Sequence, residues 1–220
     1  FEKKTEQNLK STIPYLSKLE NKVSNQVKSQ YEENPYPRWI SNEIKFLENN
    51  VFIEEVVNDD INCEILDRNT LTNNKDLLIA GCGTGRQALY AASQYLNSNV
   101  LAIDLSLNSL AYAMRKTKEL GIKNIEYIQG DILKLNKLEK QFDIIESSGV
   151  LHHMDNPLEG WKVLVNKLCS GGVMKIGLYS DIARQDVVKA REYISKRKYQ
   201  ASQNDIRKFR EDSISINLKF

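Results

Sequence analysis

The strongest constraint on the fold is an alternation of short apolar runs with helical segments that begins at Asp76. Apolar runs at 77–80 and 100–103 are each followed by a segment of helical character, at 86–96 and 107–120. Runs this apolar are typical of strands that helices cover on both faces. The alternation therefore predicts an α/β fold with a doubly wound, mostly parallel, Rossmann-like sheet.

The later part of the chain continues the same alternation. Three further strands are expected, at residues 125–128, 142–146 and 173–178. A helix over 157–168 should precede the last strand, with Asp155 or Asn156 as its cap and Pro157 at its first position. A turn at Gly171-Gly172 separates that helix from the strand. In such sheets the ligand crevice lies beyond the carboxyl ends of the strands.

The chain divides into three parts by sequence character. Residues 1–42 are expected to form N-terminal helices and an extended, aromatic-rich lid segment at 30–39, where two prolines exclude a helix. Residues 43–180 form the core, and residues 181–220 form a basic helical extension. Residues 213–220 resemble the start of a strand that is cut off, so the sheet is expected to lack its final strands and the chain to be part of a longer protein.

Composition narrows the class of protein. With 220 residues, 41% of them hydrophobic, the chain can form one main core. No apolar run approaches the roughly 20 residues of a membrane span, and the three cysteines are too scattered for a disulfide framework or a zinc site. The sequence therefore predicts a cytoplasmic protein, and no metal site is expected. The eight basic residues of 189–210 are interpreted as a solvated surface in preference to a nucleic-acid interface, because the segment contains no known nucleic-acid-binding module.

The first strand runs directly into a glycine cluster, Gly81-Cys82-Gly83-Thr84-Gly85. Glycines there allow a sharp turn and let a ligand lie against the main chain. A dinucleotide fingerprint would place its third glycine at position 86, which is Arg86. The spacing therefore favours a ligand without a pyrophosphate over NAD, and a tight turn without any ligand is the alternative.

Two acidic residues follow the next two strands. Asp104 ends the second strand, where a carboxylate can accept hydrogen bonds from both hydroxyls of a ribose. Asp131, in Gly130-Asp131-Ile132, can accept from an adenine amino group while Ile132 packs on the ring. Each acid alone could equally be a helix N-cap. Their succession at neighbouring strand ends favours an adenosine ligand.

These motifs together resemble those of class I S-adenosylmethionine-dependent methyltransferases. The matching segments are Leu77–Gly85, Ala102–Ser106, Gly130-Asp131, Phe142–His153 and Lys175–Tyr179. Residues 30–39 and 182–210 further resemble methyltransferase domains attached to tetratricopeptide repeats in bacteria. The resemblance implies S-adenosylmethionine as cofactor, S-adenosylhomocysteine as product, and an unidentified methyl acceptor. A flanking repeat domain or a partner chain is compatible with it, whereas nucleic acid and membrane are not expected as partners.

The resemblance also implies the cofactor-binding residues. The glycines would line the methionine moiety, Asp104 the ribose, Asp131 and Ile132 the adenine, and the main chain at Ser148 the sulfonium side. The full implied set is Gly81, Gly83, Gly85, Asp104, Leu105, Asp131, Ile132, Ser148, Arg38, Tyr31 and Tyr36. Arg38 could pair with the cofactor carboxylate or stack on an aromatic neighbour. Tyr31 and Tyr36 could close over the ligand or simply pack at the proline turn.

A base would help if the acceptor is a hydroxyl or a protonated nitrogen. His152 and His153 are the histidines of the chain; His152 is the predicted base, with a structural histidine as the alternative and His153 expected to pack inside. The competing functions are a non-catalytic cofactor-binding scaffold, an RNA methyltransferase that uses the basic extension, and an NAD-dependent oxidoreductase. Fold alone does not decide among them.

Overall fold

The computed structural model describes residues 2–37, 39, 74–95, 98–180, 182–200 and 202–215. The chain divides into two compact units, Phe1–Gly177 and Leu178–Phe220. Arg38 lies outside the described residues, as do residues 40–73.

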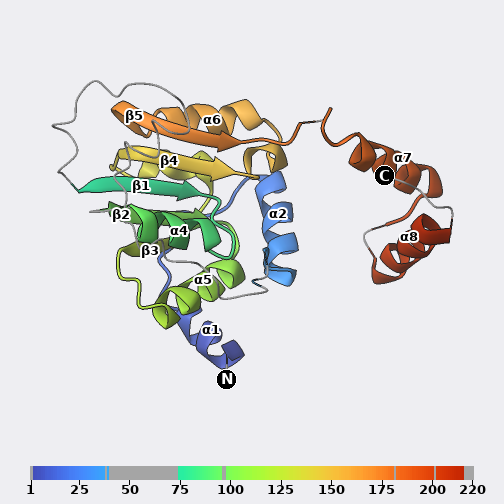
Figure 1. Ribbon diagram of the computed structural model, residues 1–220, viewed down its shortest axis with the longest axis horizontal. Helices are drawn as coiled ribbons and strands as arrows, with labels where there is room; N and C mark the ends of the chain where they lie inside the picture. Colours follow the sequence, from blue (N-terminus) through green and yellow to red (C-terminus); the bar gives the residue numbers. More distant parts are fainter. Residues whose placement is uncertain are drawn as a thin grey trace. The chain divides into compact units, whose positions relative to one another are not determined.

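The first unit is built on a five-stranded parallel sheet with the order β3-β2-β1-β4-β5 (Figure 1). Its strands are β1 (Lys75–Ala80), β2 (Ser98–Asp104), β3 (Ile125–Gln129), β4 (Phe142–Ser148) and β5 (Leu168–Gly177). Successive strands step outward from β1 to β3, and the chain then returns to the other side of β1 to form β4. The predicted doubly wound sheet is confirmed, and its topological switch point lies between β1 and β4.

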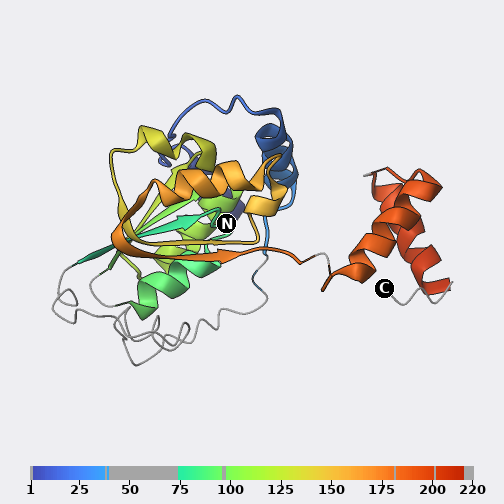
Figure 2. The same cartoon turned by 90° about the horizontal axis from the view of Figure 1, so that it is seen from above.

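Helices cover both faces of this sheet, because the strands carry apolar side chains on both faces. One face packs against α4 (Arg86–Gln94), α5 (Leu107–Glu119) and α1 (Glu2–Lys10). The other packs against α6 (Pro157–Val165) and the 3-10 helix η2 (Ile132–Lys137). Figure 2 shows α4 and α6 on opposite sides of the sheet.

The N-terminal segment wraps onto this core before the sheet begins. Leu16 donates its N–H to the carbonyl of Gln129 at the end of β3, at 2.9 Å. The helix α2 (Lys22–Glu33) then starts at its cap Asn21 and stands across the carboxyl ends of the strands (Figures 1 and 2). The prediction of an extended segment from residue 30 is wrong for residues 30–33, which are the last turn of α2 and precede both prolines.

The end of the first unit differs from the prediction in two places. The helix α6 ends at Val165, not at residue 168, because Leu168 already pairs with Phe142 in the sheet. The expected turn at Gly171-Gly172 lies inside β5, where the register with β4 shifts between Phe142 and Ile144. Asn156 is the cap of α6 and accepts a hydrogen bond from the N–H of Leu158, as one of the two predicted caps.

The second unit consists of α7 (Gln185–Arg197) and α8 (Gln203–Ser215). Asp212 of α8 accepts hydrogen bonds from the hydroxyls of Tyr193 and Tyr199, at 2.9 and 2.7 Å. The expected strand from residue 213 is wrong as far as Ser215, which belongs to α8 because the helical hydrogen bonds continue that far. Among the described residues, no helix has the length and apolar character needed to cross a membrane.

Candidate functional site at the carboxyl ends of the strands

The glycine cluster forms the turn between β1 and α4, at the switch point of the sheet. Gly81, Gly83 and Gly85 have φ values of 79°, 52° and 85°, in the left-handed region that favours glycine. At Gly83 a Cβ atom would lie 2.6 Å from the carbonyl oxygen of Tyr36. A close approach of another chain segment to this loop therefore requires glycine at position 83.

Asp104 connects this loop to the end of β2. Its Oδ2 accepts a hydrogen bond from the N–H of Gly83 at 2.8 Å, and its Oδ1 accepts one from the N–H of Ser106 at 2.9 Å. Enclosure of the carboxyl group raises its pKa, and the nearby Glu32 raises it further, whereas the main-chain donors lower it. An ionised carboxylate has about four acceptor positions. Both oxygens of Asp104 can therefore accept a further hydrogen bond.

Hydrogen bonds hold the C-terminal end of α2 beside Asp104. The carboxylate of Glu32 accepts hydrogen bonds from the N–H groups of Leu107 and Asn108, at 2.6 and 3.2 Å. Ser106 donates its hydroxyl to the carbonyl of Tyr31 at 3.1 Å. Glu32 thus supplies acceptors to the first turn of α5, where helical N–H groups have no partner within the helix.

The segment after α2 crosses the glycine loop. The N–H of Thr84 donates to the carbonyl of Tyr36 at 3.3 Å, and its hydroxyl donates to the carbonyl of Pro37 at 2.5 Å. The indole N–H of Trp39 donates to the hydroxyl of Thr84 at 3.2 Å. The ring of Tyr36 is 67% exposed, so the main chain of this segment, and not the Tyr36 ring, lies against the loop.

Asp131 and Ile132 lie beyond the end of β3. The side chain of Asp131 accepts a hydrogen bond from the N–H of Leu133 at 2.9 Å and caps η2, while Ile132 belongs to the buried core. Leu16 packs over the preceding residue, Gly130, where a Cβ would lie 2.9 Å from the Leu16 Cβ. Leu105 accepts a hydrogen bond at its carbonyl from the Gln129 side chain at 2.9 Å.

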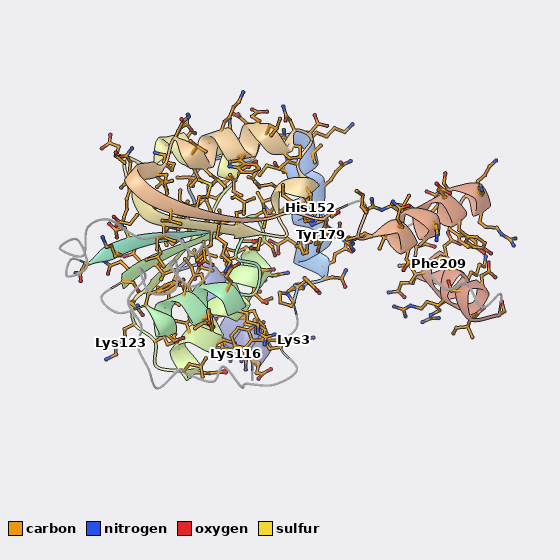
Figure 3. All side chains as sticks on the ribbon, turned by 45° about the horizontal axis from the view of Figure 1, so that its top comes forward. Lys3, Lys116, Lys123, His152, Tyr179 and Phe209 are labelled. Carbon is orange, nitrogen blue, oxygen red and sulfur yellow. The ribbon has the colours of Figure 1, made fainter. Side chains whose placement is uncertain are left out.

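The end of β4 contributes the histidines. Ser147 donates its hydroxyl to the carbonyl of Ala80 at 3.0 Å, and Ser148 is exposed. The short helix η3 (Leu151–His153) follows. The Nε2 of His153 lies 3.3 Å from the hydroxyl oxygen of Tyr31. The ring nitrogens of His152 are buried, and its ring centroid is 4.3 Å from that of His153. Figure 3 shows His152 beside α2.

The structure therefore brings together residues from separate strand ends. Gly83 and Asp104 are in contact, and Tyr31 reaches both Ser106 and His153. Sequence reasoning missed Glu32 and Leu16, because each acts on an element far along the chain and neither lies in a motif. It also missed Glu146, a buried acid at the end of the fourth predicted strand, whose only sequence signal was its charge.

The glycine loop, Asp104 and Asp131 lie in a segment that is similar to known methyltransferase domains. Residues 77–172 match the family model described as a methyltransferase domain. The match, which spans less than half of the chain, agrees with S-adenosylmethionine as the cofactor.

Relatives with similar sequences cover part of the chain. An uncharacterized protein of Synechococcus is 34% identical over 120 residues, which are 54% of this chain and 29% of that protein. A probable (S)-tetrahydroprotoberberine N-methyltransferase of Papaver bracteatum is 29% identical over 46% of this chain and 27% of its own length. A malonyl-[acyl-carrier protein] O-methyltransferase of Marinomonas is 31% identical over 54% of this chain and 43% of its own length. This chain thus spans less than half the length of each.

A solved structure with the same fold is PKMT2 from Rickettsia typhi in complex with AdoHcy. It is 21% identical to this chain, covers 67% of this chain and 29% of its own chain, and has a TM-score of 0.53. This likeness shows the fold alone.

Proposed function

We propose that this chain binds S-adenosylmethionine at the glycine loop and transfers its methyl group to an acceptor held beyond the end of β4. The observation that carries the proposal is the link between Gly83 and Asp104. It places a carboxylate that can accept further hydrogen bonds beside the main chain of the glycine loop. A ribose diol beside a methionine chain fits these two features.

Different residues of the chain would bind the ribose, the methionine moiety and the adenine of the cofactor. Asp104 would accept hydrogen bonds from the ribose hydroxyls, and the main chain of residues 81–85 would lie along the methionine moiety. Asp131, Ile132 and Leu105 would border the adenine, and Leu16 closes that end of the crevice. Arg38, for which a contact with the cofactor carboxylate is predicted, lies outside the described residues.

Methyl transfer is an in-line displacement, so the protein mainly has to hold the acceptor about 3 Å from the methyl group in a site that excludes water. The bound cofactor supplies an electrophilic methyl group. Tyr31 and the two histidines lie at the end of β4, where the acceptor would enter. His152 stays the predicted base; the contact between Tyr31 and His153 supports His153 as a second group able to hold a proton there.

The acceptor is proposed to be a small molecule, or a protein or glycan. Residues 1–42 are proposed as a lid over the site, supported by the contacts of Tyr31 and Tyr36. Residues 43–180 are proposed as the methyltransferase core, and 181–220 as an extension that connects to a repeat domain in a bacterial, cytoplasmic protein. The second compact unit, which begins at Leu178, supports a separate extension.

Calorimetric titration of the purified chain with S-adenosylmethionine, S-adenosylhomocysteine and NAD tests the proposal. Micromolar binding of the first two and no heat from NAD is the expected result, and it justifies an acceptor screen with labelled methyl groups. No binding of either sulfur ligand by a folded chain would contradict the proposal and favour a scaffold.

A further inference from the structure

A buried acid lies at the topological switch point and has no role in the proposed binding of the ribose and the adenine. Glu146, near the end of β4, is 8% exposed and pairs in register with Ile79 of β1, two residues before the glycine loop. Its Oε2 accepts a hydrogen bond from the side-chain amide of Gln87 at 2.5 Å. Gln87 belongs to the first turn of α4, the helix that the glycine loop opens.

The carboxylate of Glu146 lacks a cationic partner within the part of the chain that the structure describes. None of the ion pairs found there includes Glu146, although Lys175 is its register neighbour on β5 and is exposed. Burying an ionised carboxylate is costly unless a cation or several hydrogen bonds compensate for the lost water. One amide donor leaves most of its acceptor positions open.

We infer that Glu146 binds the α-ammonium group of the cofactor's amino-acid end. The inference rests on the proposed function, which lays the methionine moiety along the glycine loop and so directs its amino-acid end toward β4 and the start of α4. The first turn of α4, whose N-cap Gly85 provides no side-chain cap, offers N–H donors for the α-carboxylate of the same zwitterion. Glu146 then supplies the charge that the ammonium requires, and Gln87 is a positioning residue that orients the carboxylate.

The alternative is a purely structural bond that fastens α4 to β4. The substitution Glu146→Gln distinguishes the two, because an amide side chain of the same shape can still bond to Gln87 while its negative charge is gone. Glu126→Gln is the matched control, an acid-to-amide change at an exposed position of β3. The probes are S-adenosylhomocysteine and 5′-methylthioadenosine, which keeps the adenosine and the thioether but lacks the amino-acid end.

Glu146→Gln should weaken the binding of S-adenosylhomocysteine by about 10- to 100-fold, the effect of a lost charge-assisted hydrogen bond. Binding of 5′-methylthioadenosine should change by less than about 2-fold, and E126Q should leave both affinities unchanged. The inference would be overturned if E146Q lost affinity equally for both ligands, or if its affinity for S-adenosylhomocysteine were unchanged. In either case, binding of S-adenosylhomocysteine by the wild-type chain would still uphold the proposed function. Failure of the wild-type chain to bind S-adenosylhomocysteine would overturn both.

Discussion

The two strand ends on either side of β1 are built in different ways. At the end of β2, the carboxylate of Asp104 is held by the main-chain N–H groups of Gly83 and Ser106. At the end of β4, the contact with α2 is between side chains, Tyr31 and His153. Main-chain donors keep their places when neighbouring side chains change, whereas a side-chain pair depends on both partners. The contacts of Asp104 thus suit the proposed cofactor, and the contact between Tyr31 and His153 suits the proposed acceptor.

The largest effect is expected from Gly83→Ala. The new Cβ would lie 2.6 Å from the carbonyl oxygen of Tyr36. The alanine would also have to adopt the φ of 52° that Gly83 has. We expect the free energy of unfolding to fall by about 3 kcal/mol, with loss of S-adenosylhomocysteine binding. Thermal melts and calorimetry measure both.

The matched control is Gly121→Ala. Gly121 has a φ of 70° and no atom within 4 Å of its Cβ position, so this change keeps the backbone strain without the clash. It should cost about 1 kcal/mol and leave ligand affinity unchanged. Equal effects of the two substitutions would show that the segment over the glycine loop does not matter.

Asp104→Ala should weaken cofactor binding by about 1.5 to 3 kcal/mol, as expected for lost charge-assisted hydrogen bonds. Calorimetric titration with S-adenosylhomocysteine measures the change, and Glu139→Ala at an exposed position is the control. An unchanged affinity in a folded variant would remove the ribose assignment, and with it the distinction between the two strand ends.

Glu32→Gln tests how α2 is held at the β2 side. The carboxylate accepts hydrogen bonds from the N–H groups of Leu107 and Asn108, so its neutralisation should lower the free energy of unfolding by about 1 kcal/mol. Chemical denaturation measures this loss. The neighbouring, exposed Glu33 is the control, and Glu33→Gln should change stability by less than about 0.5 kcal/mol. Similar values for both would mean that the cap contributes nothing.

Tyr31→Phe should have the smallest effect. It removes the hydroxyl that lies 3.3 Å from His153, which should cost about 0.5 kcal/mol of stability and leave S-adenosylhomocysteine affinity unchanged. Tyr36→Phe is the control, since that ring is 67% exposed. A tenfold loss of cofactor affinity in Y31F alone would place the contact between Tyr31 and His153 in the cofactor site and break the comparison.

The β2 side could be predicted from the sequence because its signals are local. The glycine spacing, the apolar runs and the acids at the ends of the second and third strands lie within short segments, and the sheet is parallel as they indicated. Where an element differs from its predicted bounds, residues outside that element determine where it begins or ends. Leu168 enters the sheet early because it pairs with Phe142, and residues 30–33 remain helical because the helix-breaking prolines come after them.

The site was less predictable where long-range contacts decide it. Glu32 caps a helix that begins 75 positions later in the chain, which no local pattern reveals. Glu146 looked like the polar end of a strand, and only the packing of Gln87 against it shows a buried carboxylate. Which of His152 and His153 contacts Tyr31 depends on the orientation of η3 relative to α2. A helix of three residues is too short for its sequence periodicity to indicate that orientation.

The most direct test of the account is amide chemical-shift mapping by NMR as S-adenosylhomocysteine is added to the isotopically labelled chain. The largest shifts are predicted at Gly83 and Ser106, whose N–H groups bond to Asp104, with little change along α6. Shifts that spare these amides and cluster elsewhere would contradict a cofactor site at the end of β2.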